Sequence, residues 1–145
     1  MKKLTTLAIT AAVTATLVFP LVSSAKGNLS LRATDLPELV LGNDEAGYGI
    51  SQKEYKMETG KAYALTISST GAKECAFESH GLFNNVWMRK VEAGGIEIKA
   101  NGFYEIEFED EGEVELFFVP IKPGSYTFEC AGLAEKGMTG TFIIE

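Results

Sequence analysis

This sequence is poor in histidine, and its positive charges are outnumbered by its negative charges. Its 145 residues contain one histidine, His80, and 13 lysines and arginines against 20 aspartates and glutamates. With a single histidine, no Ser-His-Asp or Cys-His pair stands at a recognisable spacing, and no metal-hydrolase motif occurs. The sequence therefore predicts that the chain is not an enzyme and has no catalytic residue.

The first 25 residues differ in composition from the rest. Lys2 and Lys3 precede an apolar run over residues 4–22, and small residues follow at 23–25. This order is typical of a secretory signal peptide, and we expect cleavage after Ala25 and a periplasmic or secreted protein. A transmembrane anchor is the alternative, but threonines interrupt the run and no stop-transfer cluster follows, so we expect no membrane insertion after leader removal.

The expected mature part, residues 26–145, is acidic. Two of the 13 basic residues belong to the leader, so 11 remain against 20 acidic residues and the net charge is −9. This charge argues against binding to nucleic acid or to an anionic membrane surface. It suits a metal ion, or a basic protein as a redox or metal-transfer partner.

Alternation of apolar and polar residues dominates residues 50–145. In the stretch 104–118, Ile106 and Phe108 alternate with glutamates before a turn at 110–112, and Val114 and Leu116 alternate with glutamates after it. This period of two predicts a hairpin with one buried face. The same pattern predicts a second hairpin around the turn at 58–61.

The spacing of these strands indicates the fold class. Short strands, regular turn signals and no convincing helix predict an all-β fold, an antiparallel Greek-key β-sandwich, in a single domain over residues 50–145. Residues 26–49 form an irregular lead-in with one candidate strand.

The last part of the chain carries the most specific pattern. Residues 123–145 read PGSYTFECAGLAEKGMTGTFIIE, which is a turn, a strand, Cys130, a loop that ends at Met138, and a final strand. This order resembles the copper loop of the cupredoxins, the small blue copper proteins, where a thiolate, imidazoles and a weak thioether hold the metal. The resemblance implies a cupredoxin-like fold and copper as cofactor, with Cys130 as thiolate and Met138 as thioether.

The ligand set implied by this resemblance is incomplete. The family loop reads Cys-x-x-His-x-x-x-x-Met, and its histidine position holds Leu133 here. The family's other histidine lies on a strand beyond the first predicted hairpin, and by counting it falls on Cys75. The resemblance therefore implies Cys75, Cys130 and Met138 as metal ligands, a soft set that selects Cu(I) rather than the blue cupric site.

Three interpretations of the two cysteines are open at this point. They form a disulfide worth about 2–4 kcal/mol in an oxidising compartment; they bind Cu(I) together with Met138; or they are unrelated buried thiols. A reversible disulfide would let the first two alternate. The predicted function is an exported copper-binding or copper-handling module, and the alternative is a metal-free structural or protein-interaction β-sandwich. We expect Glu74, Glu135 and His80 to be solvated loop residues.

Overall fold

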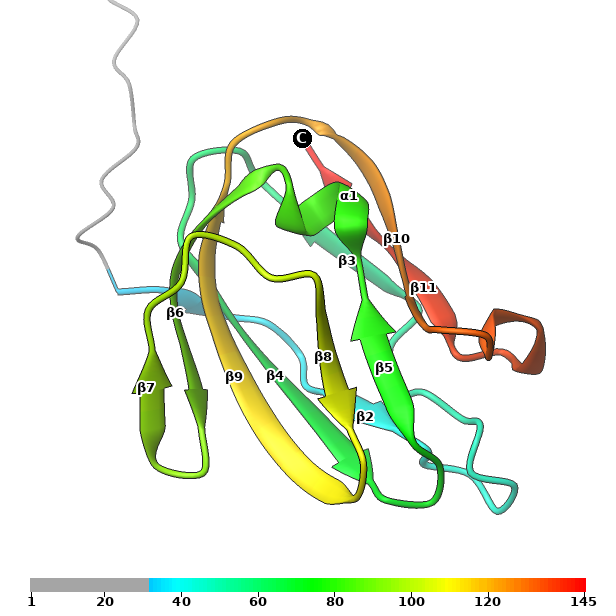
Figure 1. The fold of residues 1–145 in the computed structure, drawn as a ribbon. Helices are drawn as coiled ribbons and strands as arrows, with labels where there is room; N and C mark the ends of the chain where they lie inside the picture. Colours follow the sequence, from blue (N-terminus) through cyan, green and yellow to red (C-terminus); the bar gives the residue numbers. More distant parts are fainter. Residues whose placement is uncertain (1–31) are drawn as a thin grey trace, which may run out of the picture.

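The computed structural model describes residues 32–145, so the expected leader and its cleavage site lie outside the described residues. Residues 32–145 form a sandwich of two β-sheets (Figure 1). The first sheet has the order β1-β4-β9-β6-β7 with β2 also on β4, and the second has the order β3-β11-β10-β5-β8. The first sheet contains β1 (Thr34–Asp35), β2 (Leu39–Leu41), β4 (Tyr63–Thr70), β6 (Val86–Ala93), β7 (Ile96–Ile98) and β9 (Glu111–Pro120). The second contains β3 (Glu54–Met57), β5 (Cys75–Glu78), β8 (Glu105–Phe108), β10 (Gly124–Cys130) and β11 (Thr139–Ile144).

Two short helical segments, α1 (His80–Phe83) and the 3-10 turn η1 (Ala134–Lys136), lie between strands. No helix within residues 32–145 is both long enough and apolar enough to cross a membrane.

The all-β sandwich predicted from the sequence is confirmed, and its sheets are mixed rather than purely antiparallel. Strands β1 and β2 both run parallel to β4, and β3 runs parallel to β11. None of these pairs is joined by a tight turn, so nothing forces the antiparallel direction that a short hairpin imposes. The lead-in supplies β1 and β2, where the sequence indicated one candidate strand.

The prediction that each of the two turns joins a pair of hydrogen-bonded strands is wrong. β3 and β4 flank the turn at 58–61 but belong to different sheets, and β8 and β9 are separated in the same way around the turn at 109–110. Each turn carries the chain from one layer of the sandwich to the other. The period of two reports which face of a strand is buried, and it does not report the neighbour to which that strand is hydrogen-bonded.

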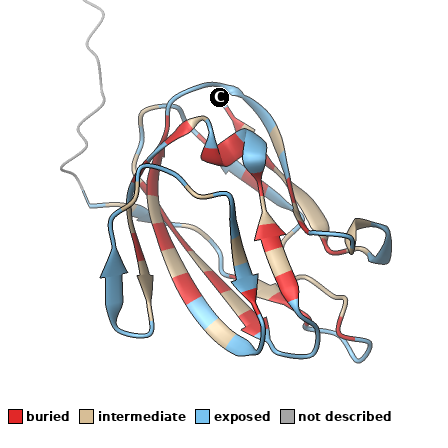
Figure 2. Ribbon diagram, in the orientation of Figure 1, coloured by how far each residue is buried: buried red, intermediate tan, exposed pale blue. Residues whose placement is uncertain are grey.

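The buried faces themselves agree with the sequence. Val114 and Leu116 on β9 are 4% and 1% exposed, whereas Glu113 is exposed. Figure 2 shows this pattern along β9, and it shows buried residues alternating with intermediate ones along β5. Aromatic rings fill the centre of the second sheet's inner face, where Phe128 lies 4.8 Å from Phe142 between ring centroids and 5.8 Å from Phe77.

Leu116 provides a direct test of this face assignment. Because its side chain is almost fully buried between the sheets, Leu116→Ala should lower the free energy of unfolding by about 2–5 kcal/mol. The matched control is Glu113→Ala on the exposed face of the same strand, which should change stability little. Urea titrations of both variants measure the difference, and equal effects would contradict the assignment.

Candidate functional site

The two cysteines meet where neighbouring strands of the second sheet begin and end. Cys75 opens β5, and Cys130 closes β10. The strands are antiparallel, with Cys130 opposite Phe77, and this register brings the cysteine Cα atoms to 5.0 Å. The two residues form a disulfide, and the described part of the chain contains no free cysteine. The interpretation of unrelated thiols is therefore wrong.

The loop after Cys130 folds back on itself and returns Met138 to the same place. Leu133 N donates to the Cys130 carbonyl at 2.9 Å, and Met138 N donates to the Leu133 carbonyl at 3.3 Å. Cys130 N in turn donates to the Met138 carbonyl at 3.0 Å. Gly137 has φ 103°, a value that favours glycine, and Lys53 Nζ donates to its carbonyl. The loop length shared with the copper loop thus closes a compact turn.

All three sulfur residues are buried. Cys75, Cys130 and Met138 are each 1% exposed and belong to the hydrophobic core, and Leu133 is half-buried against it. Metals bind thiolates, and a disulfide offers none. The donor chemistry therefore suits a soft cation only after the bond has been reduced to two thiols.

The remaining candidate ligands lie elsewhere. His80 opens α1, which follows the end of β5 opposite to Cys75 (Figure 1), and the three residue steps of β5 alone span about 10 Å. Its Nε2 lies 3.0 Å from Glu78 Oε2, and its exposed ring contacts Tyr104. Glu74 and Glu135 are exposed, as expected.

A blue cupric site does not fit the described residues. No group of three or more histidine, cysteine, aspartate or glutamate side chains within residues 32–145 is arranged to hold a metal ion. With His80 distant and Leu133 in the loop, no imidazole is available beside Cys130 for an equatorial ligand of Cu(II).

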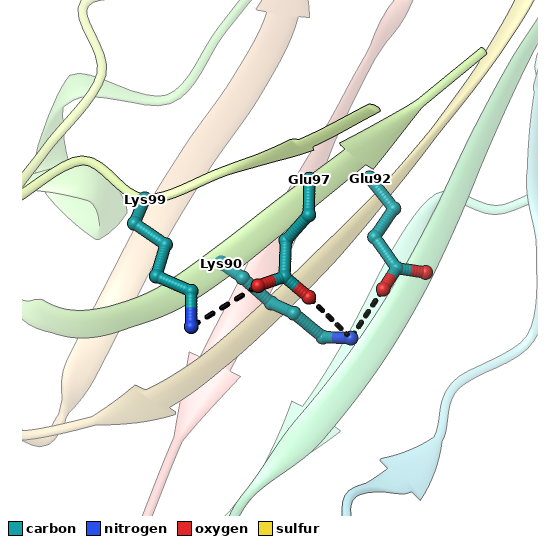
Figure 3. A network of polar contacts seen from close by, with 4 residues as sticks. All are labelled: Lys90, Glu92, Glu97 and Lys99. Carbon is teal, nitrogen blue, oxygen red and sulfur yellow. Dashed lines mark hydrogen bonds and ion pairs between the residues drawn. The ribbon is translucent and has the colours of Figure 1, made fainter. Parts of the chain in front are cut away.

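The structure also contains a charge network that the sequence reasoning missed. Lys90 on β6 pairs with Glu92 and with Glu97 on β7, and Glu97 pairs with Lys99 (Figure 3). Lys90 also lies over the Phe117 ring, 4.2 Å from its centroid. The hydrogen bond from Lys90 to Glu92 is the main cause of the raised pKa of Lys90. The signal was present in the sequence, because lysines and glutamates stand symmetrically about the Gly-Gly turn of this hairpin.

The ionisation of Glu115 makes the stability of the fold depend on pH. Glu115 lies half-buried on β9 directly opposite Glu92, and burial is the first cause of its raised pKa, followed by the charges of Glu92 and Asp35. The folded protein therefore holds this proton more tightly than the unfolded chain does. Its contribution to stability is fully present below the ordinary pKa of 4.5 and is lost as the pH rises through the folded value.

The variant Glu115→Gln, which cannot ionise, should consequently be more stable than the wild type near neutral pH. The gain should disappear as the pH falls below 4.5, where both side chains are neutral. Urea midpoints measured across this range test the prediction, with Glu109→Gln on the exposed turn as control. A gain that persists at low pH would point to packing rather than ionisation.

Copper proteins share this fold. The laccase from Pediococcus acidilactici has a TM-score of 0.62 at 14% identity, covering 81% of this chain and 28% of the laccase. The multicopper oxidase from Campylobacter jejuni has a TM-score of 0.54 at 15% identity, covering 79% of this chain and 31% of the oxidase. The copper nitrite reductase from Nitrosomonas europaea has a TM-score of 0.57 at 8% identity, covering 83% of this chain and 52% of the reductase. No protein-family model matches the sequence, and no curated protein is similar to it at the sequence level.

These likenesses establish the fold. At 8–15% identity the described chain has the architecture of a cupredoxin-like domain, as found in multicopper oxidases and copper nitrite reductase. The chain spans between about a quarter and a half of the length of these proteins. The predicted resemblance to the small blue copper proteins is thereby supported at the level of fold.

The prediction that the chain is not an enzyme is contradicted by the same comparisons. The similar structures are named as oxidases, a laccase and a reductase. The prediction rested on missing triads and hydrolase motifs, whereas redox enzymes take their reactivity from a bound cofactor and need neither. The absence of those motifs therefore does not exclude redox chemistry.

Proposed function

We propose that this chain is an exported copper-handling domain in which Cys75, Cys130 and Met138 bind Cu(I) once the disulfide is reduced. The observation that supports it is the convergence of the three sulfur residues: the cysteines are bonded, and the Met138 carbonyl accepts a hydrogen bond from Cys130 N. Thiolate and thioether donors select cuprous copper over harder ions. The cupredoxin-like fold, which copper proteins also use, points to the same metal.

The disulfide makes this site conditional on reduction. An external dithiol supplies two electrons and two protons, becomes a disulfide itself, and leaves Cys75 and Cys130 as thiols. The thiols then lose their protons when they bind a soft cation, so uptake is favoured by higher pH. Reoxidation of Cys75 and Cys130 to the disulfide removes both thiolate ligands.

Export and a protein partner belong to the same proposal. The predicted leader over residues 1–25 supports a periplasmic or secreted location, where cysteine pairs readily oxidise. The net charge of −9 on the expected mature part supports a basic redox or metal-transfer partner.

Copper titration tests the proposal. Protein reduced with a phosphine under anaerobic conditions should take up one equivalent of Cu(I) from a chromogenic chelator, whereas oxidised protein should take up much less. Met138→Leu should weaken uptake by the reduced protein because it removes the thioether and keeps the side-chain volume. The control is Met88→Leu, a buried methionine on β6, which should bind as the wild type does.

A second candidate is a metal-free structural or protein-interaction sandwich held by the same bond. It is favoured by burial, because a disulfide whose cysteines are 1% exposed is poorly accessible to a reductant. Failure of the reduced, folded protein to bind Cu(I) would support this candidate and contradict the first.

A further inference from the structure

An open groove is lined by the edge strands of both sheets. β7 is the last strand of the first sheet and β8 is the last strand of the second. Residues of both strands, together with parts of β6 and β9, line a groove of about 400 Å³. Figure 1 shows the segment that leaves β7 and crosses between the sheets to β8.

The groove combines an apolar interior with a rim of a single charge sign. Val91, Ile106, Phe108 and Val114 contribute to its apolar lining. Six carboxylates line it as well, from Glu105, Glu107, Glu109, Asp110, Glu111 and Glu113, and no lysine or arginine does. A ligand must therefore bring apolar groups for the interior and positive charge for the rim.

The backbone of β8 supplies a third element of recognition. Within residues 32–145, β8 is hydrogen-bonded only to β5, so its outer edge has no neighbouring strand. An edge strand presents a row of N–H and C=O groups that an extended peptide can pair with. All four residues of β8 line the groove, whereas β7 contributes Ile98 alone, so β8 is the edge that a ligand in the groove would meet.

We propose that this groove docks an extended, basic segment of a partner protein, which adds a strand to the outer edge of β8. Alternate side chains of an added strand point to opposite faces. Apolar side chains on one face of the segment enter the groove, and lysines or arginines on the other face meet Glu105 and Glu107. This proposal is independent of copper binding, because it uses neither cysteine nor Met138.

Charge complementarity also argues against a second copy of this chain as the occupant. Pairing two β8 edges would bring carboxylates opposite carboxylates, and like charges opposite each other in a ladder are destabilising. Acidic residues on an edge strand are a known protection against self-association. The same residues attract a basic strand.

A designed peptide tests the groove. The probe is a capped heptapeptide of alternating lysine and valine, added at low ionic strength to isotopically labelled protein of the full mature chain. We expect saturable amide shift changes in β8 and the groove lining, with slower hydrogen exchange along the outer edge of β8. A peptide of alternating lysine and serine has the same charge without the apolar face, and it should bind about tenfold more weakly or worse.

Matched charge reversals locate the contact. Glu105→Lys with Glu107→Lys reverses two charges on β8 and should raise the Kd about tenfold or more. Glu58→Lys with Glu135→Lys reverses two exposed charges outside the groove and changes the net charge equally, so it should have a much smaller effect.

Four outcomes with the peptides and the charge-reversed variants would overturn the proposal. They are the absence of saturable binding, equal weakening by both double reversals, equal binding of the serine peptide, and shifts that follow β7 instead of β8. Concentration-dependent broadening at β8 without peptide would identify a second copy as the occupant and would overturn it as well.

Discussion

Replacing both cysteines, Cys75→Ala with Cys130→Ala, is expected to lower the free energy of unfolding by about 2–5 kcal/mol. The bond joins residues 55 positions apart, and the chain between them includes β6, β7 and β9 of the first sheet and β8 of the second. Closing so long a segment removes many conformations from the unfolded ensemble. Urea unfolding of the variant beside oxidised wild type measures the loss.

Reduced wild-type protein is the natural control for that experiment. Its midpoint should approach that of the double alanine variant, because both lack the covalent link. The single variant Cys75→Ala should fall in the same range, since one missing partner is enough to remove the bond. Identical midpoints for oxidised wild type and the double variant would show that the disulfide contributes nothing to stability.

The sequence predicted the buried faces and the loop from Cys130 to Met138 because both are local properties. Alternation placed Val114 and Leu116 inward and Glu113 outward, and the resemblance to the copper loop placed Cys130 and Met138 at the two ends of one loop. Each prediction depends on neighbours along one strand or one turn. Such short-range patterns do not depend on how the strands are arranged in the rest of the fold.

Strand pairing could not be predicted in the same way. The turns at 58–61 and 109–110 connect strands of different sheets, although their flanking patterns look like hairpins. A strand with one buried face has the same alternation of apolar and polar residues whether the next strand in sequence lies beside it in the same sheet or across the core in the other sheet. The groove at β8 escaped prediction for the same reason, because it depends on where the edges of two sheets meet.

The choice between disulfide and metal site was open in the sequence because both need the same proximity. The 5.0 Å approach of Cys75 and Cys130 serves either chemistry. In the proposed function, redox state would decide which of the two the pair performs. The sequence contains no information on the reductant that the protein encounters.

The double substitution Cys75→His with Leu133→His is expected to create a coloured Cu(II) centre, whereas wild-type protein should show no intense blue colour with Cu(II). Cys75→His removes the disulfide and frees Cys130 as the only thiolate. Leu133→His supplies an imidazole from a loop that already has the family's length, with Met138 at its end. Two imidazoles, a thiolate and a weak thioether are the ligands of the blue copper site. Visible absorption and electron paramagnetic resonance spectra measure the result.

Stability separates a completed site from adventitious copper in this variant. Loss of the disulfide costs about 2–5 kcal/mol, and metal that binds only the folded state offsets part of that cost. Addition of Cu(II) should therefore raise the Tm of the double variant and leave that of Cys75→His alone, which lacks the second imidazole, less affected. A folded double variant that stays colourless would limit the likeness to cupredoxins to the backbone. A wild-type protein that turns blue would mean that ligands other than Cys75, Cys130 and Met138 hold the metal.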